Sequence, residues 1–310
     1  MSRVLYISKL NLVSRHIYDA YDDPEILTQI LKNLFFAIDD KIEHTRIDTN
    51  TVDGEELVTY KASYKFSAIE KSTDFIIVGN LIKTSNLYFN VRKEGTDELQ
   101  QDETEFSEVI HFCLDVFKEK VAFYTKNRFG YDEFNNAFTR LINEYANLEG
   151  DKNYIFETDT IKQASSIKTI QDELNQIGNI KQLKITIKPP NPDDPLLNDI
   201  HIDIEEYLKD IKEGNITDTS SLFNSSAPEG LKLNSRIVKA EFGKIEEIHS
   251  KLSDEVALAN NYVIVEAETK SGRQYSTKKR KPLTIEIKDY QTYGPEFIKV
   301  CKNLFSVSSR

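Results

Sequence analysis

The sequence predicts an α+β protein in which antiparallel or mixed sheets carry helices packed on one face. Two observations lead to this fold class. Runs that alternate apolar and polar residues follow one another closely between residues 42 and 125, and short connections of this kind join antiparallel strands. A helical pattern at residues 131–148 comes directly afterwards with its apolar residues on one side, so we expect this helix to cover the sheet.

Strand patterns dominate the first half of the chain. Residues 4–13 alternate in part and predict a first strand, and an aspartate before Pro24 then caps a helix whose apolar stripe runs from Ile26 to Phe35. Further strand patterns lie at residues 42–48, 56–66, 75–82, 85–92, 109–116 and 120–125. The last two form a hairpin across residues 117–119, and the helix at 131–148 completes this half.

The second half repeats the same alternation of strands and helices. Strand patterns lie at residues 154–158, 182–187, 237–242, 262–269 and 283–288, and helical patterns at 165–177, 204–212, 244–259 and 295–305. The prolines at 189–195 predict a semi-rigid loop because proline cannot join a central ladder. Residues 214–230, rich in Ser, Thr and Asn, predict an exposed loop.

Charge and turn signals divide the chain near Gly150, where a helical pattern ends. Residues 1–150 carry 17 Lys and Arg against 26 Asp and Glu, a net charge of −9, whereas residues 151–310 carry 23 against 25, a net charge of −2. We therefore expect an acidic N-terminal α+β domain at 1–150. A C-terminal α+β domain with a basic hairpin is expected at 151–310, and both alternatives, two domains or two subdomains of one unit, stay open.

Composition favours a cytoplasmic protein without a membrane partner. No apolar run approaches the roughly 20 residues that cross a bilayer, and the N-terminus lacks the apolar core of a secretion signal. The two cysteines, Cys113 and Cys301, lie far apart on apolar-patterned segments. We expect both to be small buried hydrophobic residues rather than nucleophiles.

The basic run at residues 270–281 reads KSGRQYSTKKRK. It holds six of the 40 Lys and Arg residues and no Asp or Glu; without it, 34 basic residues face 51 acidic ones and the formal net charge falls from −11 to −17. Clustered cations bind phosphates even on an acidic protein, and a tyrosine ring adds a stacking surface. The run therefore predicts a site for DNA or RNA, or for a protein partner. Its candidate residues are Lys270, Arg273, Tyr275, Lys278, Lys279, Arg280 and Lys281.

Three other interpretations stay open. The basic run lies between two strand patterns, so it can be an exposed hairpin tip without a ligand. Two Glu-x-Lys triplets, at 268–270 and 286–288, fit a metal-dependent nuclease, although residues 271–283 supply no further carboxylate. The acidic first half can mimic DNA phosphates, which would make the protein an inhibitor of a DNA-binding partner.

Familiar catalytic motifs are missing from the sequence. The five histidines are scattered, no Cys-x2-Cys pair occurs, and there is no GxxxxGK[ST], GxGxxG or GxSxG. We therefore expect no catalytic residue, no metal and no cofactor, and favour a binding protein over an enzyme.

Three stretches together resemble an uncharacterised bacterial family of unknown function whose members occur in mobile elements and phage-defence neighbourhoods. They read VIHFCLDVFKEKVAFY at 109–124, LKITIKPPNPD at 183–193 and GRQYSTKKRKPL at 272–283. The resemblance implies a role in the conflict between bacteria and phage, and it assigns no catalytic residue. The sequence thus predicts a non-catalytic cytoplasmic binding protein of a phage-defence or counter-defence system.

Overall fold

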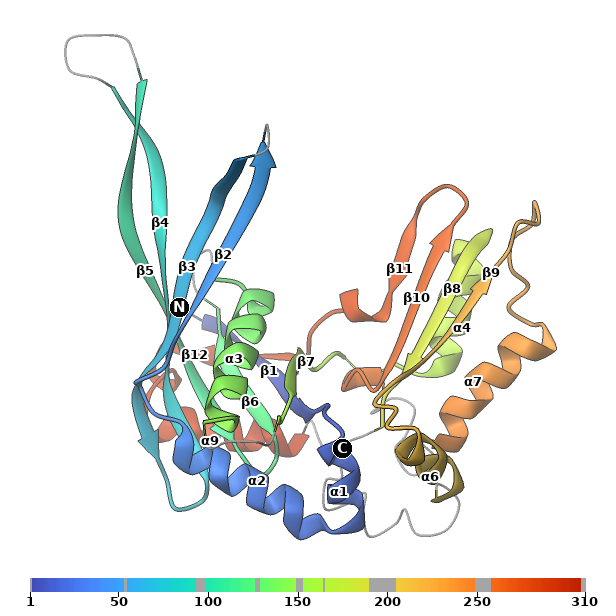
Figure 1. The fold of residues 1–310 in the computed structure, drawn as a ribbon, viewed down its shortest axis with the longest axis horizontal. Helices are drawn as coiled ribbons and strands as arrows, with labels where there is room; N and C mark the ends of the chain where they lie inside the picture. The colour runs from blue at the N-terminus through green and yellow to red at the C-terminus, as the bar shows by residue number, and fades with distance from the viewer. Residues whose placement is uncertain are drawn as a thin grey trace.

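Two antiparallel sheets built from different parts of the chain organise the fold, and Figure 1 shows them side by side. The computed structural model describes residues 2–52, 55–92, 99–125, 129–148, 153–163, 165–189, 205–248 and 258–307. The pairs of strands in these ranges are antiparallel, and helices pack on both sheets. The predicted α+β class is therefore confirmed.

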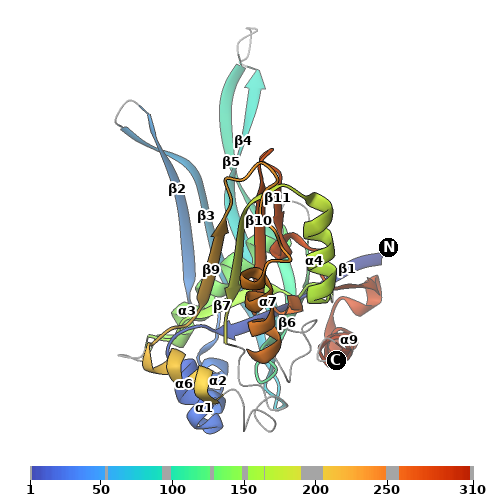
Figure 2. The same cartoon turned by 90° about the vertical axis from the view of Figure 1, so that its right-hand side faces the viewer.

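The first sheet has the order β12-β1-β6-β5-β4-β3-β2, and β7 also pairs with β1. Its strands are β1 (Ser2–Leu12), β2 (Glu43–Val52), β3 (Glu55–Lys71), β4 (Ile76–Arg92), β5 (Leu99–Asp115), β6 (Lys120–Tyr124), β7 (Phe156–Thr160) and β12 (Thr284–Lys288). The β2–β3 and β4–β5 hairpins extend away from the helices as two long arms (Figure 1), and the turned view in Figure 2 shows the arms diverging.

One face of the first sheet is covered by α2 (Pro24–Ala37) and α3 (Tyr131–Ala146). Helix α3 follows the predicted pattern, since its apolar positions recur every three or four residues and bury Phe134 and Phe138 against Phe112 of β5. Helix α2 begins at the expected aspartate cap, where the Asp23 side chain accepts a hydrogen bond from the Glu25 amide at 3.0 Å. The prediction that the 131–148 helix packs on the sheet is confirmed.

Helix α9 (Gly294–Val307) covers the opposite face of the first sheet. Successive residues of a strand point to opposite faces. On β1, Leu5 and Ile7 accordingly pack with α9, whereas Leu10 belongs to the core under α2 and α3. Both cysteines are fully buried on the α9 side, as expected for small hydrophobic residues.

The second sheet has the order β11-β10-β8-β9. Its strands are β8 (Ile180–Ile187), β9 (Thr219–Asn224), β10 (Val263–Thr269) and β11 (Gln274–Ser276). Helices α4 (Ile167–Ile177) and α7 (Arg236–Ile248) bury their apolar stripes against it in a separate core. Helix α6 (Glu205–Glu213) packs instead against α1 (His16–Asp22), where Ile211 meets Ile17 and Tyr18.

Several element predictions for single segments are wrong. The predicted strand at 237–242 is part of α7, because Val238, Phe242 and Ile245 recur at helical spacing and fill one core. The predicted loop at 214–230 contains β9, which pairs with β8 at an edge of the sheet. The two strands predicted at 75–82 and 85–92 are the single strand β4. Most of the predicted proline loop at 189–195 lies outside the described residues.

Segments of the second half complete the first sheet. Strand β7 pairs with β1 at residues 8–12, and β12 pairs with β1 at residues 2–6, so both strands join the sheet of the first half. The chain therefore passes from the first sheet to the second and returns; the boundary near Gly150 stays a prediction. Among the described residues, no helix is long and apolar enough to cross a membrane.

Candidate nucleic-acid interface

The basic run of residues 270–281 occupies two places in the fold. Lys270 to Arg273 form the turn between β10 and β11, which pair with each other. Lys278 to Lys281 belong to the linker that leaves the second sheet and enters β12 of the first sheet. The predicted hairpin tip at Lys278–Lys281 is therefore wrong, because the strands on either side of these residues lie in different sheets.

Backbone contacts hold this linker against the protein. Ser276 caps the short helix η1 (Thr277–Lys279), and the buried Thr277 hydroxyl accepts a hydrogen bond from the Val265 amide of β10 at 3.0 Å. After η1, the Gln163 amide donates to the Lys281 carbonyl at 3.0 Å, and the Leu283 amide donates to the Ile161 carbonyl at 2.8 Å. The cationic side chains thus project from a fixed backbone rather than from a free loop.

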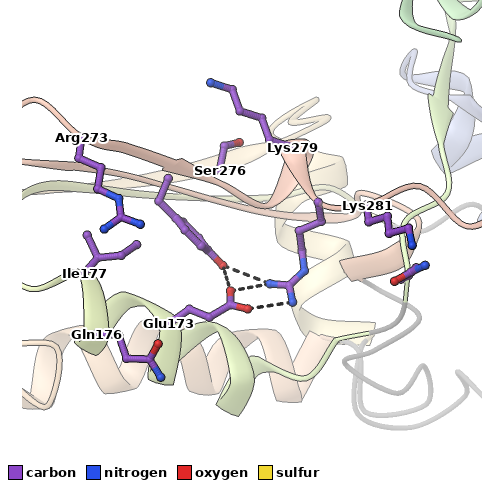
Figure 3. A pocket seen from close by; sticks show the side chains of 10 residues that line it. Glu173, Gln176, Ile177, Arg273, Ser276, Lys279 and Lys281 are labelled. Carbon is purple, nitrogen blue, oxygen red and sulfur yellow. Dashed lines mark hydrogen bonds and ion pairs between the residues drawn. The ribbon is translucent and has the colours of Figure 1, made fainter.

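Glu173 of α4 binds two of the predicted site residues. The Arg280 guanidinium donates to both Glu173 carboxylate oxygens, at 2.6 and 3.1 Å, and the Tyr275 hydroxyl donates to the same carboxylate at 2.7 Å. Figure 3 shows Glu173 reaching from α4 toward the basic segment, with dashed lines marking these hydrogen bonds. A bidentate arginine–carboxylate pair is strong and fixes geometry, so this contact fastens the linker to α4.

The pKa directions follow from this contact. Burial alone would raise the pKa of the Glu173 carboxyl, but the hydrogen bonds from Tyr275 and Arg280 outweigh it, and the pKa is lowered. Burial and the Glu173 carboxylate both raise the pKa of Tyr275. Burial lowers the pKa of Arg280, but the bond to Glu173 more than offsets this. All three groups therefore keep their charge states across the physiological range, with Glu173 and Arg280 ionised and Tyr275 neutral.

An open pocket of about 650 Å³ lies beside this contact. It is lined by Gln163, Glu173, Gln176, Ile177, Arg273, Tyr275, Ser276, Lys279, Arg280 and Lys281. Four of these residues are cationic and one is anionic. Since Glu173 neutralises Arg280, the charges of Arg273, Lys279 and Lys281 remain.

These three cations are exposed and come from two segments. Arg273 lies in the β10–β11 turn, and Lys279 and Lys281 lie on the linker. In Figure 3 the Arg273 side chain runs toward Ile177 of α4, whereas the Lys279 side chain points away from Glu173. No carboxylate among the described residues forms an ion pair with any of the three. The pocket therefore has an excess of positive charge that the described part of the chain does not neutralise.

The structure separates the seven residues predicted for the site. Five of them line the pocket: Arg273, Tyr275, Lys279, Arg280 and Lys281. The other two lie outside the lining. The Lys270 ammonium donates to the Ser226 carbonyl at 3.2 Å. Lys278 lies near Asp159 of β7, and its positive charge on its own would lower the pKa of that carboxyl. Burial dominates at Asp159, however, and its pKa is raised.

The sequence did not single out the part of the pocket that α4 supplies. Glu173, Gln176 and Ile177 lie on one helix, and Glu173 is 107 residues from its partner Arg280. Glu173 follows the buried Ile170 by three residues, so it lies at the border of the apolar stripe. A single acidic residue at such a border is an ordinary feature of amphipathic helices, and no sequence signal marked it as a partner of the basic run.

The Glu-x-Lys triplets considered for a nuclease do not come together. Glu268 and Lys270 belong to the β10 end of the second sheet, and Glu286 and Lys288 belong to β12 of the first. Glu268 pairs with Lys181 at 3.2 Å, and Glu286 is exposed. Within the described ranges, no group of three or more His, Cys, Asp or Glu side chains is arranged to hold a metal ion.

Comparison with known proteins gives one family match. Residues 51–248 match a family model described as "Domain of unknown function (DUF4747)". No curated protein and no solved structure gives a significant match. The matched residues include Glu173 but end before the basic run at 270–281. The expectation of an uncharacterised family agrees with this description, which names no activity.

Proposed function

This chain belongs to the DUF4747 family, and we propose that it is a non-catalytic protein that binds nucleic acid at the pocket between α4 and the basic linker. The observation that carries the proposal is the set of three exposed cations, Arg273, Lys279 and Lys281, around one open pocket. Lysine and arginine are the usual phosphate ligands of nucleic-acid-binding proteins. Glu173 removes Arg280 from this set, which leaves three phosphate contacts where the sequence suggested more.

The setting of this activity is a separate part of the proposal. A role in defence or counter-defence against phage, in the bacterial cytoplasm, rests on the resemblance of three sequence stretches. The proposed binding of phosphate groups at the pocket is the same whether or not the protein has that role or a protein partner.

Binding is measured by the fluorescence anisotropy of labelled 20-nucleotide DNA and RNA, single- and double-stranded. The test variant combines Arg273→Ser, Lys279→Ser and Lys281→Ser. Three working contacts predict that the affinity of the wild-type protein falls about 20- to 40-fold between about 50 and 200 mM salt. The variant should bind more weakly to every sequence and lose most of this salt dependence, because phosphate contacts carry no base information.

A control variant changes the net charge equally at a distance from the pocket. Lys61→Ser, Lys65→Ser and Lys299→Ser alter exposed residues of β3 and α9. This control should retain most of the binding. No binding by the wild-type protein at low salt, or equal losses in the two triple variants, would contradict the proposed function.

A further inference from the structure

A buried lysine without a carboxylate partner lies next to the linker. Lys162 follows β7 and is 7 % exposed. Among the described residues, its ammonium has no hydrogen bond and no ion pair within 4.0 Å; its described contact is with the ring of Tyr131, 5.9 Å from Nζ to the ring centroid. A buried charge is costly unless an opposite charge or hydrogen bonds compensate it. The Lys162 nitrogen is not among the fully enclosed, unpartnered side-chain atoms of the described residues, so it reaches solvent and is open to an external anion.

The surroundings hold Lys162 in this position. Tyr131 is the first residue of α3, and its ring stacks on Tyr6 of β1 with the ring centroids 5.3 Å apart. Tyr6 stacks in turn on the buried Phe123 of β6 at 5.9 Å. The Lys162 amide donates to the Ala259 carbonyl at 2.9 Å. Both the backbone of Lys162 and the ring beside its ammonium are thus fixed by the core.

Two carboxylates lie near Lys162 without neutralising it. Burial lowers the pKa of the Lys162 ammonium, and the charges of Asp132 and Asp159 raise it by less. Asp159 also lies near Lys188 and Lys278, which share its charge. Glu157 is also close, and it pairs with Lys188 at 2.6 Å. These charges balance as three against three, so Lys162 is singled out by its lack of a direct partner among the described residues and not by a local excess of positive charge.

Lys162 is directly connected to the proposed pocket. It forms an isolated antiparallel bridge with Pro282, the residue that follows Lys281. Its neighbour Gln163 lines the pocket and donates its amide to the Lys281 carbonyl. The Lys162 backbone thus borders the pocket beside Lys281, and its side chain lies on the Tyr131 side of this segment.

We infer that Lys162 is a further phosphate-binding residue, which receives a backbone phosphate of the nucleic acid held by Arg273, Lys279 and Lys281, and that Tyr131 positions its side chain. This inference rests on the proposed function. It adds a phosphate contact near the first sheet to the contacts near the second sheet, across the linker that joins the two sheets.

The first test measures salt dependence with the 20-nucleotide probe that the wild-type protein binds best. Lys162→Met keeps the length of the side chain and removes its charge, and we expect the slope of log K against log salt to fall by about 0.7 to 0.9, the value of one phosphate contact. Lys162→Arg keeps a cation and should retain the slope. Because Lys162→Met removes an uncompensated buried charge, its urea midpoint should be equal to or above that of the wild-type protein.

The second test measures the chemical reactivity of the Lys162 amine. Trace acetylation with acetic anhydride followed by mass spectrometry gives the reactivity of each lysine, and Lys162 should be protected when the probe is bound, whereas Lys61 should not. An unchanged salt slope in Lys162→Met together with unprotected Lys162 would overturn this inference, while the triple pocket variant would still decide the proposed function. If the wild-type protein binds no probe, both proposals are contradicted.

Discussion

Beside each sheet, a glutamate on a packed helix contacts a tyrosine and a cation, and these two triads differ in their surroundings. In the first sheet, Tyr64 donates to Glu133 at 2.6 Å and Lys83 pairs with Glu133 at 2.9 Å. In the second, Tyr275 and Arg280 bind Glu173 at 2.7 and 2.6 Å. Both triads fasten a helix to strands or to a linker, since Glu133 lies on α3 and Glu173 on α4.

The first triad is enclosed and holds no excess cation. The Lys83 side chain is 9 % exposed and lies 3.9 Å from Glu108, which is 4 % exposed. Burial alone would lower the pKa of Lys83, but the bond to Glu133 outweighs it, and the pKa is raised. Three further cations surround the second triad and face an open pocket. The same local contacts are therefore enclosed in one case and lie beside an exposed, positively charged pocket in the other.

The largest effect should come from the enclosed triad. Lys83→Ala removes the enclosed cation that pairs with the partly buried Glu133, and breaking a buried pair costs about 3 kcal/mol in the free energy of unfolding. Urea denaturation measures the change. Lys209→Ala on α6 is the control. The Lys209 ammonium lies 4.0 Å from the Glu213 carboxylate and both side chains are exposed, so this ion pair should contribute little to stability. Equal midpoints for Lys83→Ala and the control would show that the enclosed triad is not a stabilising element.

A matched pair of hydroxyl deletions sharpens the comparison. Tyr64→Phe and Tyr275→Phe each remove one hydrogen bond to a glutamate, and bonds to charged groups contribute about 1.5–3 kcal/mol. We expect about 2 kcal/mol for Tyr64, which is buried, and about 1 kcal/mol for Tyr275, where water can replace the hydroxyl. Double-mutant cycles with Glu133→Gln and Glu173→Gln isolate the two bonds. A larger coupling energy at Tyr275 would reverse the contrast between the enclosed and the open triad.

The fold was predictable where the local pattern and the final packing agree. Alternation marked β5 and β6, and the spacing of Phe134, Phe138 and Leu141 marked α3, because each pattern matches the face that becomes buried. The segment at 237–242 resembles a strand because its β-branched residues obscure a helical spacing that becomes clear only over the longer range of α7. Strand β9 lies at an edge and packs little side-chain surface, so its Ser- and Thr-rich sequence resembles a loop.

The candidate site was predictable only in its local part, the run of cations that are close in sequence. Six cations within twelve residues are visible in any sequence, and five of the seven predicted residues line the pocket. Their partner Glu173 was not predictable, because the contact joins residues 107 positions apart. The sequence also carries no sign that β11 and β12 belong to different sheets, which turned an expected hairpin into a linker. Lys162 stands alone in the sequence, and its importance arises only from burial and from the bridge to Pro282.

The smallest expected effect is the change in nucleic-acid affinity when the glutamate of either triad loses its charge. Glu173→Gln frees Arg280 for phosphates, and the gain should be about two- to fivefold in affinity, since a partly exposed ion pair is worth about 0.5–1 kcal/mol. Glu133→Gln is the matched control, and it should leave binding unchanged because Lys83 is enclosed. Anisotropy titrations of both variants measure the difference. A weaker affinity in Glu173→Gln would show that Glu173 supports binding by holding the linker rather than opposing it by charge.

The pH dependence of the same variant distinguishes charge from shape. The pKa of Glu173 is lowered in the folded protein, so the carboxylate stays ionised above its unfolded value of about 4.3. The stability that the Glu173 charge contributes is therefore complete above about pH 4.3 and is lost only as the pH falls through the lower folded value. The affinity ratio of Glu173→Gln to the wild-type protein should accordingly stay constant from about pH 8 to pH 5. A ratio that converges toward one within that range would mean that the Glu173 charge is titrated there, and hence that Arg280 does not hold it in the ionised state.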